Sequence, residues 1–524
     1  MAPTLTDRQT PEADLYLLAC LMLAQFILTL LGVAGLLISC LLGLFLSAMG
    51  LTRSLAKPDL VGFLLLLLYA GMCMFSSLAV YGNLTLSYGP SHLLFPLLYL
   101  LLSTMNGRES ALLRRLCALW AAVVALWGLG EFLWRSLLLG TPRRLGGLLG
   151  NPNALGIFLV VGWFLLQDCL KDRDRIPAPL PFLEPFLLIA LSLTLSMGGF
   201  VALAAGMFLD LLIRWRKTSL RDALNGLWPS LAKATLCFGT GILLYLSVTR
   251  TEFPLVALLP LAYALALSAC WPRLDAYLTA RPRAAFVLAL LGLLVAVGAV
   301  AIRPSALATF AQRLEMMKSG LAYLPAHPLT GVGAYRWRFL DMADGGTYFN
   351  TWHIHNSLLH VGVEMGWIAM AALIFLVLHF FRKDHSEAQT AAFTAFLVHN
   401  MMDTSFFYTG ITSLVLLTAT RPRDGGKPLS GRTTRLLFAG FALLFAFLLL
   451  YYLFRTGGVD MKAPKDEFSS VRLLLLAFGL LSALILTLCL SSRLSLPPLV
   501  GRSLTDEEVR TVISRNSPLT EYVL

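Results

Sequence analysis

The residues best suited to chemistry lie in a short polar segment, where His353 and His355 alternate and Asn356 follows directly. A histidine with a pKa near neutrality can take a proton from an attacking hydroxyl group, so His355 is the candidate general base. His353 and Asn356 are placed to contact substrate, and Asn356 is equally suited to cap a helix. His399 and Asp403, one helical turn apart, are candidates to orient His355. On spacing alone, an ordinary interfacial histidine is the stronger interpretation of His355.

A metal site is the alternative for the same histidines. His353 and His355 are spaced to chelate one ion, and His399 with Asp403 would supply two further ligands. The chain has no HExxH motif, however, and its eight cysteines stand singly, without CxxC spacing. We therefore expect neither a bound metal nor another cofactor.

Four arginines near the same segment are candidates to bind an anionic substrate: Arg250, Arg313, Arg336 and Arg338. The planar guanidinium donates two parallel hydrogen bonds and stays charged, which suits a diphosphate. Arg313 is also predicted to begin an amphipathic helix that lies on the membrane. Contact with lipid headgroups is the alternative for each arginine taken singly.

A turn of sequence His-Pro-Leu-Thr-Gly-Val-Gly begins at His327. Glycines that follow a proline mark a tight change of direction, and we expect this turn, His327 included, to bind or position substrate. His360 and Glu364 are spaced four residues apart on the predicted helix that follows. They are expected to pair with each other inside the helix bundle.

Composition places the chain in a membrane. Apolar residues make up 57% and charged residues only 13%, whereas soluble proteins average about 25% charged residues. The apolar residues form runs of about 17 to 25, long enough to cross about 30 Å of hydrocarbon. Runs that do not alternate form helices rather than a barrel. We expect an all-α, polytopic membrane protein with about 14 to 16 transmembrane helices.

Lys and Arg residues cluster in alternate loops between the apolar runs, which places those loops in the cytoplasm. The net charge of +12 therefore reflects topology rather than a nucleic-acid surface. Both termini then lie inside and the long polar loop lies outside. The predicted parts are a cytoplasmic N-terminus (1–14), an N-terminal transmembrane bundle (15–302), an external catalytic loop (303–355), helices that complete the core (356–420), extra C-terminal transmembrane helices (421–491) and a cytoplasmic tail (492–524).

One external loop, 135–153, is unusually basic for its side of the membrane. It carries Arg135, Arg143 and Arg144, followed by two adjacent glycines. Positive charge normally retains a loop in the cytoplasm, so these arginines run against the trend. An anionic ligand at the outer face would explain them. Loop solubility and contact with phospholipid headgroups would explain them equally well.

Four short motifs follow one another along the chain: Gly-Asn-Pro-Asn at 150–153, the turn at 327–333, His-Asn at 355–356 and Gly-Val-Glu-Met-Gly-Trp at 362–367. In their order, spacing and external location they resemble the O-antigen ligase and O-antigen polymerase superfamily of bacterial envelope enzymes. That superfamily includes O-linked protein oligosaccharyltransferases. The resemblance covers residues 58–420.

The resemblance implies a GT-C-like membrane glycosyltransferase without a metal. Such enzymes move a glycan from an undecaprenyl diphosphate carrier to a hydroxyl of a lipid or polysaccharide acceptor, on the outer face of the cytoplasmic membrane. The resemblance maps the general base or acceptor-orienting residue onto His355 and a diphosphate-binding arginine onto Arg313. Family members commonly carry Ser-Arg-Gly at one span end, where this chain has Met197 in place of the arginine. Arg250 is the candidate substitute.

Three alternatives to a ligase remain open. A repeat-unit polymerase of the same superfamily would use the same site. A transporter or flippase of lipid-linked substrates would also have many spans, but transporters carry inverted repeats and charges inside the spans. Here the charges gather in an external loop, which favours an enzyme. An inactive scaffold is the third alternative, because Met197 replaces the expected arginine.

Overall fold

A computed structural model describes residues 12–28, 33–53, 57–84, 86–171, 180–250, 253–302, 305–346, 349, 351–422 and 430–456. All of them belong to one compact unit, Met1–Leu480. The regular structure of these segments is helical, and no strand occurs among them, which confirms the predicted all-α class. The part of the predicted C-terminal helices beyond residue 456 and the predicted tail at 492–524 lie outside the described residues.

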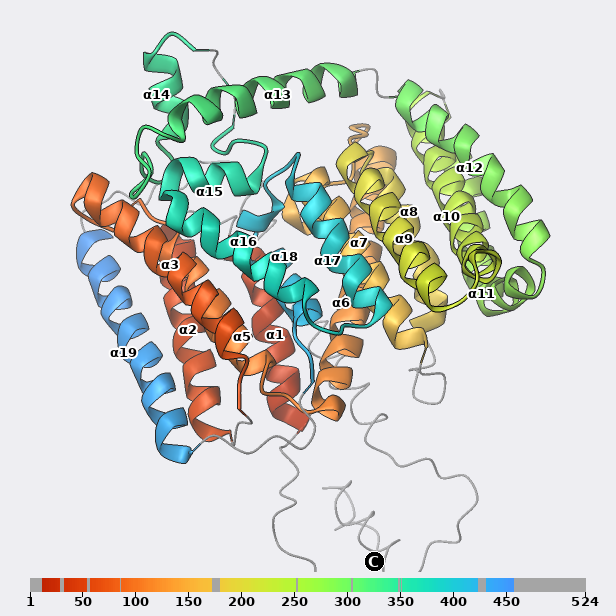
Figure 1. The fold of residues 1–524 in the computed structure, drawn as a ribbon. Helices are drawn as coiled ribbons and strands as arrows, with labels where there is room; N and C mark the ends of the chain where they lie inside the picture. The colour runs from red at the N-terminus through yellow and green to blue at the C-terminus, as the bar shows by residue number, and fades with distance from the viewer. Residues whose placement is uncertain are drawn as a thin grey trace, which may run out of the picture. The chain divides into compact units, whose positions relative to one another are not determined.

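The first part of the chain forms two helices from the long apolar stretch at its start and then a series of further helices (Figure 1). In order they are α1 (Glu12–Leu28), α2 (Val33–Thr52), α3 (Leu60–Tyr81), α4 (Gly89–His92), α5 (Leu94–Leu102), α6 (Gly107–Leu133), the π-helical turn η1 (Trp134–Leu138), the 3-10 turn η2 (Gly147–Leu149), α7 (Pro152–Leu170), α8 (Leu180–Leu193) and α9 (Met197–Lys217).

The second part contains the polar segment and the helices around it. In order these are α10 (Leu220–Thr249), η4 (Pro254–Ala257), α11 (Leu258–Ala280), α12 (Pro282–Ile302), α13 (Ser305–Tyr323), α14 (Trp337–Ala343), α15 (Ser357–Met365), α16 (Trp367–Phe381), α17 (Glu387–Asn400), η5 (Ser405–Phe407), α18 (Thr409–Ala419) and α19 (Gly431–Thr456).

Seven helices of the described chain are long and apolar enough to cross a membrane, and seven shorter apolar helices accompany them. The long ones are α3, α6 with η1, α7, α9, α10, η4 with α11, and α19. Their length and composition confirm a multi-pass membrane protein. Because a bilayer core offers no water to unpaired amides, helices that satisfy their own backbone are the expected form of these runs.

Hydropathy predicts one span over residues 356–381, but this segment is broken at Gly366, between α15 and α16. Gly366 has a φ of +88°, and a Cβ there would lie 2.4 Å from the carbonyl oxygen of Leu329. Only glycine accepts both conditions. The prediction was wrong here because apolar residues continue on both sides of the break and hydropathy does not reveal it.

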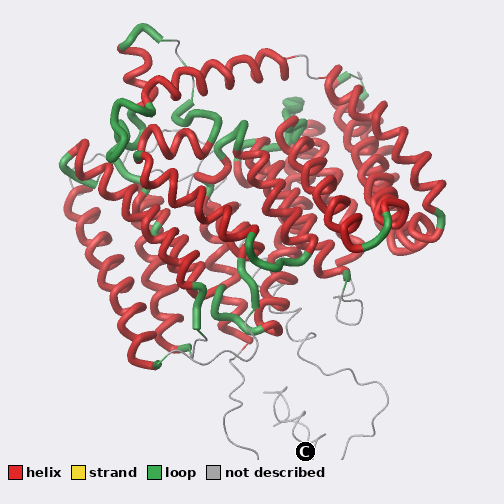
Figure 2. The backbone as a smooth tube through the Cα atoms, viewed as in Figure 1, coloured by secondary structure: helices red, strands yellow, loops and turns green. Residues whose placement is uncertain are grey.

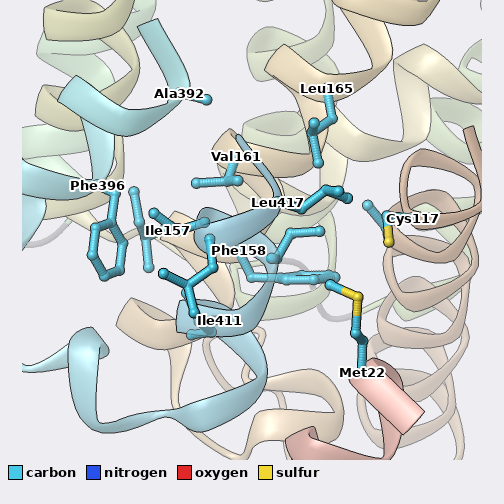
Figure 3. Close-up of a cluster of buried hydrophobic side chains, with 14 of the residues drawn as sticks. Met22, Cys117, Ile157, Phe158, Val161, Leu165, Ala392, Phe396, Ile411 and Leu417 are labelled. Carbon is cyan, nitrogen blue, oxygen red and sulfur yellow. The ribbon is translucent and has the colours of Figure 1, made fainter. Parts of the chain in front are cut away.

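The helix α7 is the most deeply packed of the long spans, with 78% of its apolar stretch buried. Its side chains meet those of α1, α6, α17 and α18 in one cluster (Figure 3), which includes Met22, Cys117, Ile157, Phe158, Val161, Leu165, Phe396, Ile411 and Leu417. Close packing of this kind is what holds helices together in lipid, where apolar contact alone gives no preference for protein neighbours. The N-terminus of α7 therefore has a fixed place beside α17 and α18.

The predicted external loop is largely folded, with α13 and α14 joined by loops to α15 (Figure 2). The helix α13 begins at Ser305, so the prediction that Arg313 begins it was wrong; Arg313 lies in its middle. The segment has a small core of its own, formed by Met316, Val332, Trp337, Phe349, Ile354 and Val363. This core anchors the chain directly before His355.

Candidate active site

His355 is held between two anchored neighbours at the start of α15. Ile354 is fully buried in the small core, and its amide donates to Nδ1 of His360 at 3.3 Å. The side chain of Asn356 accepts from the amide of Leu359 at 3.0 Å and so caps α15. Asn356 thus takes the capping role that its type allows, which satisfies an otherwise unpaired amide of the first turn. These two contacts fix the backbone on either side of His355.

Arg313, Asp403 and His355 form a relay of side chains from three separate elements. Nη2 of Arg313 lies 3.0 Å from Oδ2 of Asp403, and Nη1 donates to the carbonyl oxygen of Met402 at 2.6 Å. The same Oδ2 lies 3.9 Å from Nδ1 of His355. Asp403 is almost fully buried, and the other two side chains are largely buried. The structure thus brings together three of the residues that the sequence singled out.

The protonation states within this relay suit base chemistry. Burial lowers the pKa of His355, the Asp403 carboxylate raises it, and Arg313 adds to the lowering. The net pKa lies below the ordinary value, so the imidazole is neutral near pH 7. Burial alone would raise the pKa of Asp403. The groups around it, His399, His355 and Arg313, outweigh burial and hold that pKa below its usual range.

Some polar atoms of the relay and of the neighbouring His399 have no partner in the described part of the chain. Nδ1 of His355, Nε of Arg313 and Nε2 of His399 are buried there without a hydrogen bond. Buried polar groups are normally paired, because an unpaired one costs free energy. A substrate could pair these donors and acceptors, so their position beside an ionised carboxylate is the feature of this cluster that best indicates a binding site.

The loop that follows α17 holds Asp403 rigidly. The amide of Thr404 donates to Oδ1 of Asp403 at 2.8 Å. The hydroxyl of Ser357 donates to Oδ1 of Asn400 at 2.7 Å and to the carbonyl oxygen of Asp403 at 3.2 Å. Ser357 and Asn400 were not singled out from the sequence. Their adjacency to His-Asn and to His399 was the only signal for them.

His399 lies beside the relay without joining it by a hydrogen bond. Its Nδ1 pairs with the hydroxyl of Ser405 at 3.1 Å. Its ring faces the start of α9, since a Cβ built on Gly198 would lie 3.3 Å from Nε2. His399 therefore contributes to the setting of Asp403, and its contact with α9 was not visible in the sequence.

The glycine turn docks on the end of α15. The amide of Val332 donates to the carbonyl oxygen of Val363 at 2.8 Å, and Gly333 donates to that of Glu364 at 3.1 Å. Gly331 has a φ of +65°, and a Cβ there would lie 2.2 Å from the Glu364 carbonyl carbon. Glycine is thus required by both conformation and space. The turn positions the segment that leads to α14.

Glu364 organises that segment from inside. Its fully buried carboxylate accepts from the amides of Tyr335 at 2.8 Å and Trp337 at 3.2 Å. Nε2 of His360 lies 3.2 Å from the same group, which confirms the predicted pair. The hydroxyl of Tyr88 from the α3–α4 connection donates to it at 3.3 Å. The Glu364 carboxylate therefore fixes the backbone after the turn through these two amides. The spacing of His360 and Glu364 did not indicate this role.

His353 lies among aromatic rings rather than beside the relay carboxylate. Its ring stacks on Phe407 with centroids 4.7 Å apart, and it meets His360 at 4.9 Å. Burial, reinforced by His360 and His355, holds its pKa well below the usual value. The ring is therefore neutral, and its Nε2 is buried without a hydrogen bond in the described residues.

The remaining predicted site residues lie more openly. His327, Arg336 and Arg250 are exposed, with Arg250 capping the end of α10. The guanidinium of Arg338 lies over the ring of Trp352, 4.3 Å from its centroid. Within the described chain, no hydrogen bond or ion pair joins these four side chains to the relay. These three arginines and His327 therefore lie outside the relay.

The span end that contains Met197 has a guanidinium from elsewhere in the chain. Nε of Arg144 donates to the carbonyl oxygen of Thr194 at 2.9 Å, and Nη2 donates to that of Leu195 at 3.3 Å. Nη2 also donates to the side chain of Asn153 at 3.0 Å. Arg144 is one of the arginines that are unusual for the side of the membrane on which their loop is predicted. Nothing in the sequence connects it with the Met197 turn.

Among the residues that the structure describes, no group of three or more histidine, cysteine, aspartate or glutamate side chains is placed to hold a metal ion. In a comparison with family models, residues 235–374 match the model described as O-antigen ligase. The matched region includes Arg313, the glycine turn, His355 and Glu364. Comparisons with curated proteins and with solved structures gave no match.

Proposed function

We propose that this chain transfers a glycan from an undecaprenyl diphosphate carrier to an acceptor hydroxyl at the outer face of the cytoplasmic membrane, because residues 235–374 match the family model of O-antigen ligases. Family and fold together give the general class, a multi-pass membrane glycan transferase. The donor, the acceptor, the side of the membrane and the roles of individual residues constitute the proposal. The observation that carries it is the relay of Arg313, Asp403 and His355.

His355 is the general base in this proposal. Its neutral imidazole takes the proton of the acceptor hydroxyl at Nε2. The hydroxyl oxygen forms a bond to the anomeric carbon of the glycan, and the bond from that carbon to the diphosphate breaks with its electron pair. Undecaprenyl diphosphate leaves as the second product. A base of this kind contributes roughly 10²- to 10⁴-fold to a rate.

Asp403 supports His355 through Nδ1. Its carboxylate, 3.9 Å away, selects the tautomer in which Nδ1 carries the proton and Nε2 is free to accept one. It also stabilises the imidazolium that forms as the acceptor is deprotonated. A 3.9 Å separation is longer than a hydrogen bond, and catalytic hydrogen bonds commonly tighten only when substrate is bound.

Arg313 serves both the base and the donor. A guanidinium has five N–H donors, and only two of its nitrogens are engaged by Asp403 and Met402. The remaining donors, Nε among them, are available to the departing diphosphate. Fixed positive charge at a leaving group lowers the barrier because it needs no reorganisation during the reaction. Arg336, Arg338 and Arg250 supply further positive charge to the donor.

The test is glycan transfer by purified His355→Ala protein with a lipid-linked glycan as donor. The rate is expected to fall by about 10²- to 10⁴-fold, with the thermal unfolding midpoint unchanged. His385→Ala is the matched control, because His385 stacks on Phe380 between α16 and α17 and has no role in the proposal. Normal transfer by His355→Ala would overturn the proposed function.

Ligation and polymerisation are distinguished by the surface polysaccharide of a deletion strain. A missing ligase leaves finished chains on the lipid carrier. A missing polymerase leaves single repeat units. The first pattern is the expected one.

A further inference from the structure

A cavity of about 400 Å³ lies beside the N-terminus of α7, in the basic loop that the sequence had marked as anomalous. The end of α6, the turns η1 and η2 and the first residue of α7 form its wall. Its volume lies within the range of about 300 to 1,000 Å³ that is usual for small-molecule sites. Arg135, Arg143 and Arg144 all contribute to the lining.

The charge of this arginine cavity is not cancelled by its own walls. Glu131 is the one acidic residue of the lining, and it pairs with Arg135, Nε to Oε1, at 2.9 Å. Arg144 is held by the carbonyl oxygens of Thr194 and Leu195. Arg143 is exposed and makes no hydrogen bond or ion pair in the described part of the chain. Two arginines are thus fixed, and the third is free to close on a ligand.

Glycines bring the backbone close to the same space. Gly146, Gly147 and Gly150 line the cavity, and the last two have φ values of +51° and +63°. A Cβ on Gly146 would lie 3.0 Å from the carbonyl carbon of Gly150. The amides at the start of α7 are already taken by the side chain of Asn151. The positive potential of the cavity therefore comes from its arginines and not from the helix end.

The arginine cavity is connected to the relay through one short chain of contacts. Arg144 donates to Asn153 at 3.0 Å, and the amide of Asn153 donates to Asn151 at 2.9 Å. The side chain of Asn151 donates to the hydroxyl of Tyr408 at 2.9 Å. Tyr408 belongs to the same loop as Asp403 and lies within its electrostatic reach. The two sites thus lie at the same end of the helix bundle.

We propose that the arginine cavity binds the phosphoryl oxygens of a lipid-linked diphosphate, so that the donor is gripped at its diphosphate before its glycan reaches His355. This inference rests on the proposed function and deepens it. Planar guanidinium groups donate bidentate hydrogen bonds to phosphate oxygens. The cavity has three guanidinium groups and one carboxylate, so its lining carries a net positive charge that an anion would balance.

The chain offers a matched control in a second hollow of similar size, about 380 Å³, on α9. That hollow is lined by Leu209, Leu212, Ile213 and Trp215 with a single arginine, Arg216. Arg216 is exposed, as Arg143 is, but its neighbours are apolar. Arg143→Ala and Arg216→Ala therefore remove the same charge from equally open positions in different settings.

Binding is measured with the full chain in nanodiscs of phosphatidylcholine, with undecaprenyl diphosphate and phosphatidylglycerol as separate probes. Arg143→Ala is expected to weaken undecaprenyl diphosphate binding about tenfold or more, since a charge-assisted hydrogen bond contributes about 1.5–3 kcal/mol. Arg143→Lys restores part of the loss, and Arg216→Ala leaves binding unchanged. His355→Ala, assayed in parallel, abolishes transfer but retains binding.

Each other outcome overturns a defined statement. Equal losses with both probes would assign the cavity to membrane headgroups and overturn the donor assignment. Unchanged binding of undecaprenyl diphosphate by Arg143→Ala would overturn the cavity as its site, while the loss of transfer in His355→Ala would keep the proposed function. Normal transfer by His355→Ala would overturn the function even where Arg143 still governs binding.

Discussion

Two groups of buried charge in this protein are built from similar residues and differ in how completely they are paired. The first joins α8, α10 and α11, where Nζ of Lys233 lies 3.0 Å from Glu184 and 2.9 Å from Asp275. The indole N–H groups of Trp163 and Trp271 donate to the same Glu184 carboxylate at 3.1 and 2.8 Å. Every charged group there has its partners within the helices.

The second group is the relay at the end of the bundle. Arg313 and Asp403 are paired at 3.0 Å, as tightly as Lys233 and Glu184. His355, however, reaches the carboxylate only at 3.9 Å, and its Nδ1 has no hydrogen bond in the described residues. The relay is thus incomplete where the Lys233 group is complete.

The comparison shows why burial of charge alone does not mark an active site. A charge inside a membrane protein is costly and is a functional candidate by default. In a fully paired group, interactions within the protein offset that cost, and no hydrogen-bond donor or acceptor remains for a ligand. An incompletely paired group has hydrogen-bond donors and acceptors that can contact a substrate, which is what a reaction requires. Completeness of pairing therefore separates the two roles.

The largest effect is expected from Glu184→Ala, which leaves Lys233 without its buried partner. Removing one partner of a buried pair costs about 3–5 kcal/mol of stability. The thermal unfolding midpoint in detergent should fall strongly, whereas the transfer rate per folded molecule should not change. A lower rate with an unchanged midpoint would contradict the structural role of this group.

Asp403→Asn, in contrast, should lower mainly the transfer rate and to a lesser extent the stability of the fold. The amide keeps the shape of the carboxylate but loses the charge that orients His355 and stabilises its protonated form. Transfer per folded molecule is expected to fall about a hundredfold, within the range of base catalysis, and the unfolding midpoint should fall less than in Glu184→Ala, because the amide oxygen can still accept from Arg313. A full rate in Asp403→Asn would remove this residue from the relay.

Arg313 variants test whether Arg313 binds the donor in addition to pairing with Asp403. Arg313→Ala should lower kcat/KM for the lipid-linked donor about tenfold more than Arg313→Lys does, because lysine keeps the charge and loses only the planar fork. The measurement is the donor dependence of transfer at saturating acceptor. Equal values for both variants and the parent would exclude Arg313 from donor binding.

The smallest effect is a displacement of the pH profile. His355 acts when neutral, and its folded pKa is lowered, so the acidic limb of kcat/KM should lie below the ordinary histidine value of about 6.5. Asp403 raises that pKa, so Asp403→Asn should move the limb to still lower pH. A displacement to higher pH would contradict the assigned contact.

Much of the fold follows from the sequence because helix formation in a membrane is a local matter. The helical class is confirmed, and seven helices of the described chain are long and apolar enough to cross a membrane. The His360 and Glu364 pair is confirmed because four residues make one helical turn. The break at Gly366 was missed because it occurs inside apolar sequence, where a docked carbonyl rather than polarity decides the conformation.

The sequence by itself determined which residues are ionisable, which segments are helical and which loop is anomalously basic. Only the tertiary structure decided that Arg313 meets Asp403, 90 positions away, and that Arg144 meets the Thr194 turn, 50 positions away. Helical periodicity and hydropathy act over a few residues. Contacts between distant helices depend on packing, which sets which side chains meet and which polar atoms stay unpaired.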